Sequence, residues 1–294
     1  MTGIDIRPLR TRTEREACLR LQEETWGPDF ADRVPASVLM IALETGGIAS
    51  GAFEEGHLVG FVFGITGLRD GSPVHWSDML AVHPSHRGRG IGHRLKLHQR
   101  QELLDRGVRT MLWTFDPLEA RNAHLNLNRL GAVVRTYRRD LYGDSASPLH
   151  AGFGTDRLLA EWQLDSERTR SRIGEAGPPA SGGAPVGGDD ESAARAGHTD
   201  IGGAGEAPFL HGWRPGNPHP APGRDLAPPV EPVVRLSIPA DIQALKRDDM
   251  TLAREWRSVV RSGFEDCFRA GYVAVALQRG TPACNYVLVR GLTR

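Results

Sequence analysis

This chain has few cysteines, no long apolar run and no excess of charge of either sign. Its three cysteines, Cys18, Cys267 and Cys284, lack C-x-x-C spacing, so neither a disulfide framework nor a zinc site is indicated. No run approaches about 18 consecutive apolar residues, and the amino terminus lacks a basic stretch followed by an apolar core. We therefore expect a soluble cytoplasmic protein without a membrane anchor or a metal ion.

The charge balance excludes further classes of partner. Lys plus Arg equals Asp plus Glu, at 36 each, so no net field draws the chain to nucleic acid or to an anionic membrane. One local run of basic residues contains no acid: Arg87, Arg89, Arg94, Lys96 and Arg100. This run suits a phosphate-rich ligand. Arg87 and Arg89 are the candidate contacts, whereas Lys96 and Arg100 are expected to face solvent.

Glycine and proline are abundant, at 35 and 20 residues, and they are unevenly distributed. In the segment 174–229 roughly two in five residues are Gly or Pro, a composition that buries too little apolar surface to offset chain entropy. We predict a folded domain over 1–165, a disordered linker over 166–230 and a small αβ extension over 231–294. The extension is too small to cover its own apolar face, so we expect it to pack on the first domain or on a partner subunit.

Hydrophobic periodicity predicts alternating strands and helices. Thr13 and Glu16 have the spacing of a capping box, which marks the expected start of the first helix. The expected strands are at 4–9, 48–53, 57–65, 74–83, 111–115, 133–141, 157–164, 233–238, 272–277 and 286–289, and the expected helices at 13–26, 38–43, 90–106, 119–130 and 245–270.

The most informative motif is the run Arg87-Gly88-Arg89-Gly90-Ile91-Gly92, between the apolar segment 79–82 and a helical pattern that begins at Ile91. Backbone N–H groups at a helix start have no partner within the helix, and the peptide dipoles add partial positive charge there. Glycine lets an anion approach the backbone closely. The run is therefore a predicted phosphate cradle.

Two other phosphate loops do not fit these letters. A dinucleotide fingerprint, G-x-G-x-x-G, lacks its last glycine, because His93 and Leu95 stand at the two positions concerned. A Walker A loop requires Lys after its last glycine, but Gly92 is followed by His93 and Arg94. The pattern that fits is R-x-x-G-x-G; the remaining alternative is a glycine-rich turn without a ligand.

This pattern, after a strand with Leu80, Val82 and Pro84, resembles the pyrophosphate loop of the GNAT superfamily of acyl-CoA-dependent N-acyltransferases. Further matches follow the loop. Leu112 to Asp116 resemble the family's next strand, and Asn122, Ala123 and Leu130-Gly131-Ala132 resemble its helix ending in L-G-F. The resemblance implies an α/β (α+β) fold, with a mixed, mainly antiparallel twisted sheet flanked by helices.

The resemblance also implies a co-substrate and its contacts. The co-substrate is acetyl-CoA or another acyl-CoA such as succinyl-CoA, and no metal is implied. Positions matching the family's coenzyme contacts lie on the strand, the loop and the following helix: Leu80, Ala81, Val82, Arg87, Gly88, Arg89, Gly90, Ile91, Gly92 and Asn122.

Transfer from a thioester to an amine requires a base for the ammonium and an acid for the leaving thiolate. Asp116 is the first candidate base, because a carboxylate in a partly desolvated cleft has a raised pKa. It is equally suited to capping the following helix. Asp78 is the second candidate. Many relatives place a tyrosine that acts as the acid four residues before the helix-ending glycine. Leu127 stands there in this chain, so Tyr137 and Tyr142, on the next expected strand, are the substitute candidates, with Tyr137 the first choice.

A narrower resemblance links the extension to a bacterial subgroup of GNAT-like proteins whose C-terminal helix reads W-R-x-x-x-R, matched by Trp256, Arg257 and Arg261. Some members belong to N-succinyl amino-acid metabolism, which makes succinyl-CoA a candidate donor. Arg254, Arg257 and Arg261 fall on one face of the expected helix, and a guanidinium group is suited to binding a carboxylate on donor or acceptor. The simpler interpretation is surface arginines whose stems lie over an apolar helix.

The sequence therefore predicts an enzyme that transfers an acetyl or succinyl group from acyl-CoA to the amine of a small molecule, such as an amino acid. The alternative is a non-catalytic acyl-CoA sensor, which the missing tyrosine and the long linker keep open. We expect no nucleic-acid or membrane partner, and a homodimer is compatible with the sequence.

Overall fold

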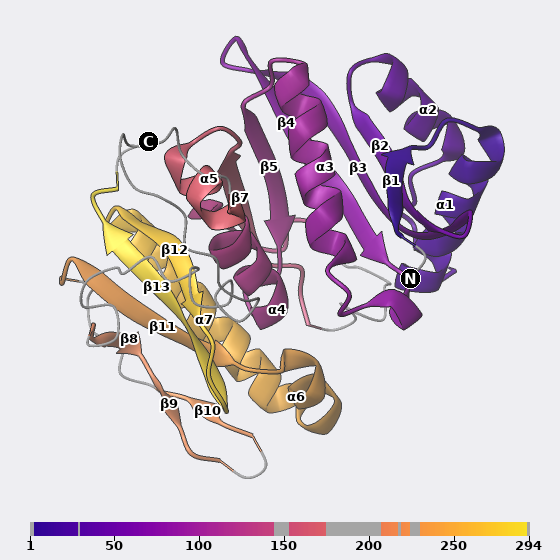
Figure 1. Ribbon diagram of the computed structural model, residues 1–294. Helices are drawn as coiled ribbons and strands as arrows, with labels where there is room; N and C mark the ends of the chain where they lie inside the picture. The colour runs from indigo at the N-terminus through magenta and orange to yellow at the C-terminus, as the bar shows by residue number, and fades with distance from the viewer. Residues whose placement is uncertain are drawn as a thin grey trace, which may run out of the picture. The chain divides into compact units, whose positions relative to one another are not determined.

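The computed structural model of this chain describes residues 3–28, 30–143, 153–174, 207–216, 219–223 and 230–292, which form a mixed α/β structure (Figure 1). The chain divides into two compact units. The first comprises Met1–Thr114, Asp140–Thr155 and Gln163–Asp165, and the second comprises Phe115–Arg139, Asp156–Trp162 and Ser166–Arg294. The division therefore falls inside the predicted domain 1–165 and not at its end.

The first unit is built on a sheet with the strand order β1-β2-β3-β4-β5. The first four strands are antiparallel, whereas β5 is parallel to β4. The elements are β1 (Asp5–Pro8), α1 (Arg12–Trp26), α2 (Ala36–Glu44), β2 (Ile48–Glu54), β3 (His57–Arg69), β4 (Ser72–Val82), η1 (Pro84–His86), α3 (Ile91–Asp105) and β5 (Thr110–Phe115), of which Phe115 belongs to the second unit.

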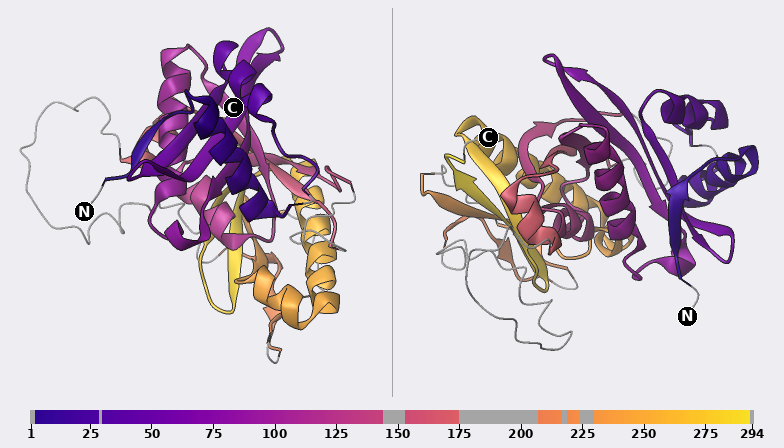
Figure 2. Two further views of the ribbon diagram at one scale, coloured as in Figure 1. Left: turned by 90° about the vertical axis from the view of Figure 1, so that its right-hand side faces the viewer. Right: turned by 45° about the horizontal axis from the view of Figure 1, so that its top comes forward.

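Helices cover both faces of this sheet (Figure 2). On one face, α1 and α2 bury Leu21 and Leu39 in a cluster that includes Phe61 of β3. On the other face, α3 packs so closely that a Cβ on Gly60 of β3 would lie 3.3 Å from Leu95 Cδ1. Burial of apolar side chains on both faces makes this sheet a rigid support for the loop between β4 and α3.

The first helix begins two residues earlier than the sequence predicts. Glu14 N donates to Thr11 Oγ1 at 3.2 Å, and Thr11 N donates to Glu14 Oε2 at 2.9 Å, so the capping box is formed by Thr11 and Glu14. The prediction of Thr13 and Glu16 is wrong because the pattern T-x-x-E occurs twice in succession. Only the box nearer to β1 starts the helix.

The second unit contains a sheet with the order β7-β6-β12-β13-β11-β8. Its elements are α4 (Ala120–Ala123), η2 (His124–Arg129), β6 (Val133–Arg138), β7 (Arg157–Gln163), α5 (Glu167–Ile173), β8 (Phe209–His211), β9 (Trp213–Arg214), β10 (Ala221–Pro222), β11 (Val233–Pro239), α6 (Ile242–Asp248), α7 (Met250–Arg269), β12 (Tyr272–Gln278) and β13 (Ala283–Arg290).

The C-terminal extension is continuous with this sheet. Strand β12 pairs with β6 through Ala274 and Val134, both of which are fully buried. Helix α7 packs against the same sheet and buries Trp256 and Phe264. Residues 231–294 therefore complete a core that the predicted domain 1–165 begins.

Helical segments depart from the expected bounds in two places. The helix predicted at 119–130 is a short α-helix followed by the π-helix η2. The helix predicted at 245–270 is two helices, because Asp249 ends α6 and caps α7, accepting a hydrogen bond from Leu252 N at 2.9 Å. A side-chain cap of this kind competes with continuation of the preceding helix.

Part of the segment predicted as a disordered linker is folded. Helix α5 is capped by Ser166, whose Oγ accepts a hydrogen bond from Thr169 N at 3.2 Å. Strand β8 pairs in parallel with β11, and β9 pairs with β10. Residues 175–206, 217–218 and 224–229 of this segment lie outside the described ranges.

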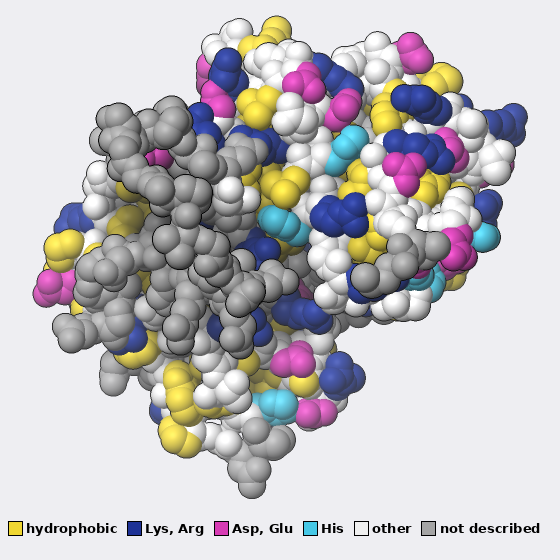
Figure 3. Space-filling view, in the orientation of Figure 1, with side chains coloured by type: hydrophobic (Ala, Val, Ile, Leu, Met, Phe, Trp, Pro, Cys, Tyr) yellow, Lys and Arg dark blue, Asp and Glu magenta, His cyan; other side chains and the backbone are white. Residues whose placement is uncertain are grey.

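The surface of the first unit carries charges of both signs, interspersed over the face drawn in Figure 3. This agrees with equal numbers of acidic and basic residues in the sequence. No helix among the described residues has both the length and the apolar character needed to cross a bilayer.

Candidate active site

A β-bulge at Asp78 marks the middle of β4. Phe63 of β3 pairs with Met79 and Gly64 pairs with Ser77, so Asp78 is the extra residue. A bulge of this kind reverses which residues face each side of the sheet. Bulges are frequent beside active sites because they redirect side chains and backbone groups.

The reversal is visible in the contacts of the β4 side chains. Before the bulge, Ser77 faces α3, where its Oγ lies 2.9 Å from Gln99 Oε1. After the bulge, Leu80 faces α3, since a Cβ on Gly92 would lie 3.4 Å from Leu80 Cδ2. Ala81 belongs to the core cluster beneath α1 and α2. Asp78 therefore lies where β4 changes face.

Strands β4 and β5 separate next to this bulge. Their parallel pairing joins Val74 to Thr110 and continues to Trp76 and Leu112. Beyond these residues β4 runs on to Val82 without a ladder to β5 in this described part of the sheet. The result is a gap whose closed end lies at Trp76 and Leu112. A backbone edge without a ladder can donate hydrogen bonds to an extended ligand.

The open end of β4 leads into the predicted phosphate loop. Gly88 and Gly90 have positive φ angles of 82° and 72°, which glycine adopts without a steric penalty. A Cβ at either position would have open space around it. The first helical hydrogen bond of α3 runs from Arg94 N to Gly90 O, at 3.1 Å, so the amides at the start of α3 point out of the helix.

The two candidate arginines of the loop are held differently. Arg89 forms two hydrogen bonds with Glu54 of β2, at 3.2 and 2.5 Å, and His86 Nε2 lies 2.9 Å from the same carboxylate. Arg89 and then His86 lower the pKa of Glu54 to about 2. Arg87 is exposed, and its Nε donates to Val82 O at 3.2 Å. A bound phosphate would compete with Glu54 for Arg89.

Lys96 and Arg100 are buried, at 4% and 5% exposure, contrary to the sequence expectation of a solvent-facing position. Lys96 Nζ donates to Ser77 Oγ at 2.7 Å, and Arg100 Nε donates to Leu164 O at 2.6 Å. Each charged group donates hydrogen bonds to neutral oxygens inside the unit. Residue type alone does not predict such buried partners.

Asp78, the second candidate base, lies in the same unit as the loop. Its side chain keeps solvent contact. Desolvation by the surrounding protein raises its pKa, and the nearby charge of Asp32 acts in the same direction. A hydrogen bond with Trp76 lowers the pKa but does not cancel this rise. Asp32 belongs to the connection between α1 and α2. Asp78 therefore feels the charge of a second carboxylate, and a cationic amine would be attracted to this pair.

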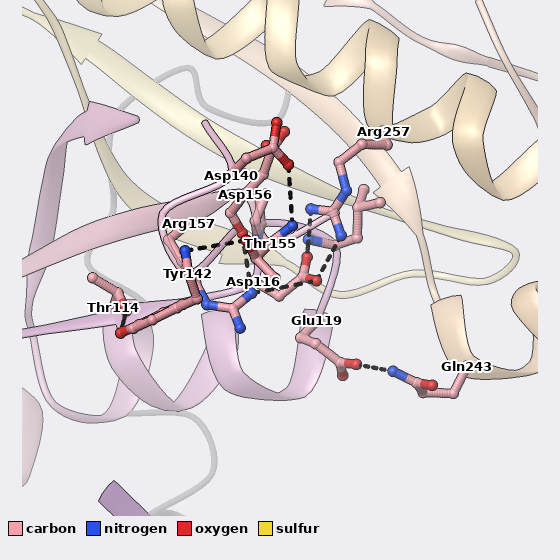
Figure 4. A network of polar contacts seen from close by, with 12 residues as sticks. Thr114, Asp116, Glu119, Asp140, Tyr142, Thr155, Asp156, Arg157, Gln243 and Arg257 are labelled. Carbon is pink, nitrogen blue, oxygen red and sulfur yellow. Dashed lines mark hydrogen bonds and ion pairs between the residues drawn. The ribbon is translucent and has the colours of Figure 1, made fainter. Parts of the chain in front are cut away.

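Asp116, the first candidate base, belongs to the second unit and has an internal partner. The guanidinium of Arg257 donates to its two carboxylate oxygens at 2.9 and 2.6 Å (Figure 4). Burial raises the pKa of Asp116, but Arg257, Leu118 N and Arg157 together lower it below its usual value. The expectation of a raised pKa is therefore wrong, because sequence could not reveal the arginine.

The capping alternative for Asp116 agrees better with its contacts. Its Oδ1 accepts a hydrogen bond from Leu118 N at 2.8 Å, and its carbonyl oxygen accepts one from Glu119 N at 3.1 Å. These bonds fix the turn between β5 and α4. Glu119 in turn accepts a hydrogen bond from Gln243 of α6 at 2.5 Å (Figure 4).

Tyr137 is likewise engaged within the second unit. Its hydroxyl donates to Asp156 Oδ2 at 2.6 Å, and desolvation together with this carboxylate raises its pKa. Arg261 holds the same carboxylate at 2.7 and 2.9 Å. A phenol in this setting keeps its proton, so its contacts do not favour Tyr137 as an acid.

The remaining candidates of the second unit lie on α4 and η2. Asn122 is exposed on α4, and Leu127 is fully buried in η2. Periodicity did not predict the π-helix, a rare form that is frequent at functional sites. The first unit contains one tyrosine, Tyr142. Its hydroxyl lies 3.0 Å from Oγ1 of Thr114, a residue of β5 that follows the last pairing of β5 with β4 (Figure 4).

The structure thus brings together, in the first unit, Asp78, the strand residues Leu80, Ala81 and Val82, and the loop 87–92. Asp116, Tyr137 and Asn122 lie in the second unit. Sequence reasoning missed the bulge, the Glu54 partner of Arg89 and the Arg257 partner of Asp116. The partner residues are too distant in sequence for spacing to connect them.

Comparison with known proteins agrees with this architecture. Residues 14–131 match the family model described as Acetyltransferase (GNAT) family. The match begins in α1 and ends at Gly131, so it spans the bulge, the loop and α3. The region 14–131, which is fewer than half of the residues of the chain, is therefore similar to the acetyltransferases of the GNAT family. No curated protein matches the chain.

Three solved structures illustrate the similarity. The ribosomal-protein-S18-alanine N-acetyltransferase from Escherichia coli is 20% identical, with a TM-score of 0.43, over 55% of this chain and 94% of that one. The Salmonella typhimurium protein YncA, with its cofactor acetyl-CoA, is 19% identical, with a TM-score of 0.45, over 61% and 99%. An aminoglycoside 6'-N-acetyltransferase complexed with coenzyme A is 17% identical, with a TM-score of 0.42, over 55% and 98%.

Proposed function

We propose that this chain transfers an acyl group from acyl-CoA to the amine of a small molecule, such as an amino acid. The observation that carries this proposal is the separation of β4 from β5 beside the Asp78 bulge, with an open glycine loop at the far end of β4. The pyrophosphate would bind the amides at the start of α3. The pantetheine arm would then lie along the edge of β4, with the thioester near the bulge.

Asp78 would accept the proton from the acceptor ammonium. Its pKa is raised, chiefly by desolvation, and the charge of Asp32 acts in the same direction. A raised pKa brings a carboxylate closer to the range in which it works as a base. Tyr142, beside Thr114 on β5, would donate a proton to the leaving thiolate. The backbone amides at the bulge would stabilise the thioester oxygen as it becomes anionic.

The test measures thiol release from acetyl-CoA and from succinyl-CoA in the presence of pooled amino acids and polyamines. Acceptor-dependent release with either donor supports the transferase. CoA should also protect the protein against thermal unfolding, since a ligand that binds only the native state stabilises it. Protection without thiol release, across the pool, would favour the sensor instead.

A matched pair of loop variants separates binding from folding. Gly90→Ala places a side chain at a φ angle of 72° and in the space proposed for the phosphate, so protection by CoA should be lost. Gly46 has a φ angle of 86°, and a Cβ there also meets open space, so Gly46→Ala is the strain control. Equal loss of CoA protection in both variants would contradict the proposed binding position.

A further inference from the structure

A buried cation lies where β4 and β5 separate. Lys96 of α3 is 4% exposed, and its Nζ donates to Ser77 Oγ at 2.7 Å and lies 4.2 Å from the centre of the Trp113 ring. Ser77 follows Trp76, and Trp113 follows Leu112, the last two residues that pair the strands. The ammonium group therefore marks the closed end of the gap.

The contacts of this amine are all with uncharged groups. Besides Ser77, Lys96 Nζ approaches Gln99 Oε1 at 3.3 Å and Met111 Sδ at 3.8 Å. No carboxylate of the described residues forms an ion pair with it, and desolvation lowers its pKa to about 7. A buried charge without a counter-ion is costly, so such a group is rarely retained for stability.

A chain of hydrogen bonds holds this polar end of the gap in one arrangement. Gln99 Nε2 lies 3.0 Å from His75 Nε2, and His75 Nδ1 lies 2.9 Å from Thr66 Oγ1, which donates to Gly46 O at 2.8 Å. Because the Gln99 amide donates to the neutral imidazole, its oxygen is directed at Lys96. The hydrogen-bond acceptors near the amine are thus fixed, and its positive charge is met by neutral oxygens and by the face of the Trp113 ring, without a carboxylate.

The gap between β4 and β5 runs from the glycine loop toward this charge. The glycine loop lies at the Val82 end of β4, and Lys96 lies at the Ser77 end, five residues away and therefore about 16 Å along the strand. Resting on the proposed function, a coenzyme held at the loop would send its acyl chain along β4 toward Lys96. An acetyl group offers nothing to pair with an ammonium ion.

We propose that Lys96 selects the acyl donor, and that the preferred donor is a coenzyme A thioester whose acyl chain ends in a carboxylate. The carboxylate would accept a charge-assisted hydrogen bond from Nζ in place of the weak contact with Met111 Sδ. The residue acts on binding of the acyl chain and takes no part in proton transfer from the acceptor.

The selection depends on pH in a defined direction. The pKa of Lys96 is lowered to about 7, so the ammonium form predominates below about pH 7 and decreases above it. The preference for a carboxylate-bearing donor therefore falls as pH rises, by up to about tenfold per pH unit. The neighbouring imidazole does not titrate in this range, because the pKa of His75 is lowered to about 3, chiefly by desolvation.

The experiment measures binding of CoA, butyryl-CoA and succinyl-CoA by calorimetry at pH 6 to 9, on the full chain. Succinyl-CoA should bind at least about tenfold more tightly than butyryl-CoA at pH 6, with the ratio falling above about pH 7. Phosphate titration affects both donors alike and cancels in the ratio. In Lys96→Met the preference should vanish at every pH, while CoA binding persists.

The exposed Gln101 on the same helix provides the control, since Gln101→Met should leave the ratio unchanged. Equal affinities for the two donors in the unmodified protein would overturn the proposal, and that result needs no variant to fold. A preference that survives Lys96→Met would also overturn it. Failure of CoA itself to bind would instead overturn the proposed function, so the two failures are distinguishable.

Discussion

Asp78 is the residue on which the proposed chemistry most depends. Replacement of Asp78 with Asn removes the base but keeps the size of the side chain, so kcat should fall by about 10² to 10⁴ while acyl-CoA binding persists. The pKa of Asp78 is raised, and the carboxylate must be ionised to act. The rate of the unmodified protein should therefore rise with pH through that pKa, and this rise should be absent in Asp78→Asn.

The matched control is Glu44→Gln at the end of α2, an exposed carboxylate of the same unit that has no proposed role. It should leave both the rate and its pH profile unchanged. An Asp78→Asn variant with a full rate would exclude Asp78 as the base.

Tyr142 is the second residue whose role can be isolated. Removal of its hydroxyl in Tyr142→Phe should lower kcat with a thioester donor by about tenfold to a hundredfold, and should leave binding of acyl-CoA unchanged. A donor whose thiol leaves more easily, such as an aryl thioester, should lose less. The comparison of the two donors, measured under saturating conditions, distinguishes proton donation from a structural role. An equal loss with both donors would contradict the assignment.

Residue-scale prediction from sequence succeeded where a role depends on the local backbone. The loop glycines are readable because positive φ and a helix start are local properties. It failed for charged side chains. Lys96 and Arg257 were expected at the surface, as their type suggests, but partners from other strands and helices hold both inside. The pair Asp116 and Arg257 spans 141 positions, which no spacing rule connects.

At the scale of elements, α7 holds the end of β5 and the start of β7 through two bidentate ion pairs. Arg257 binds Asp116, and Arg261, one helical turn further on, binds Asp156. Asp116 directly follows β5, and Asp156 directly precedes β7. The W-R-x-x-x-R spacing of the extension is therefore explained by an internal contact, and neither arginine is available to a substrate carboxylate without losing its partner.

Breaking one of these pairs should be strongly destabilising. Asp116→Asn removes the carboxylate charge from the bidentate pair with Arg257, which is 5% exposed, at a cost of about 3 to 5 kcal/mol in the free energy of unfolding. The double variant Asp116→Leu with Arg257→Met should recover most of this loss. Urea unfolding measures the free energy of unfolding of each variant. A loss below about 1 kcal/mol in Asp116→Asn would contradict a stabilising buried ion pair.

The exposed pair Arg269 and Asp266 on the same helix is the control. Its side chains are 74% and 44% exposed, so Asp266→Asn should cost at most about 1 kcal/mol.

The ion pair between Asp116 and Arg257 also predicts a pH dependence of stability. The native pKa of Asp116 lies below its usual value of 3.8, so the contribution is full above that pH and is lost as pH falls through the lowered value. In Asp116→Asn, the free energy of unfolding should depend less on pH in this acidic range.

Secondary structure followed from the sequence where periodicity is strong, as in the hairpin of β2 and β3 and in α3. It could not place the break at Asp249 or the π-helix η2, because both depend on side-chain contacts within the folded second unit. Asn128, within η2, accepts a hydrogen bond from Leu277 N of β12 at 2.8 Å. A contact between positions 149 residues apart leaves no trace in a local pattern.

At the scale of the whole molecule, the two units do not correspond to the acyltransferase domain and its extension. The second unit combines 115–139 and 156–162 with the C-terminal segment. A chain ending at residue 165 would lose the β12 partner of β6 and both arginines of the α7 clamp. It would expose Val134 and remove Arg257 from Asp116 and Arg261 from Asp156.

We therefore expect the fragment 1–165 to be unable to fold alone, although the family model ends at residue 131. It should bind a hydrophobic dye, lack a cooperative thermal transition and elute as aggregates. Co-expression of 1–174 with 207–294 supplies β12 and α7 as a separate chain and should restore a compact complex. A monodisperse 1–165 fragment with a sharp transition would show that β6 and β7 need no cover, and the extension would then be an accessory. Failure of both arrangements would place the requirement in the covalent connection between the halves.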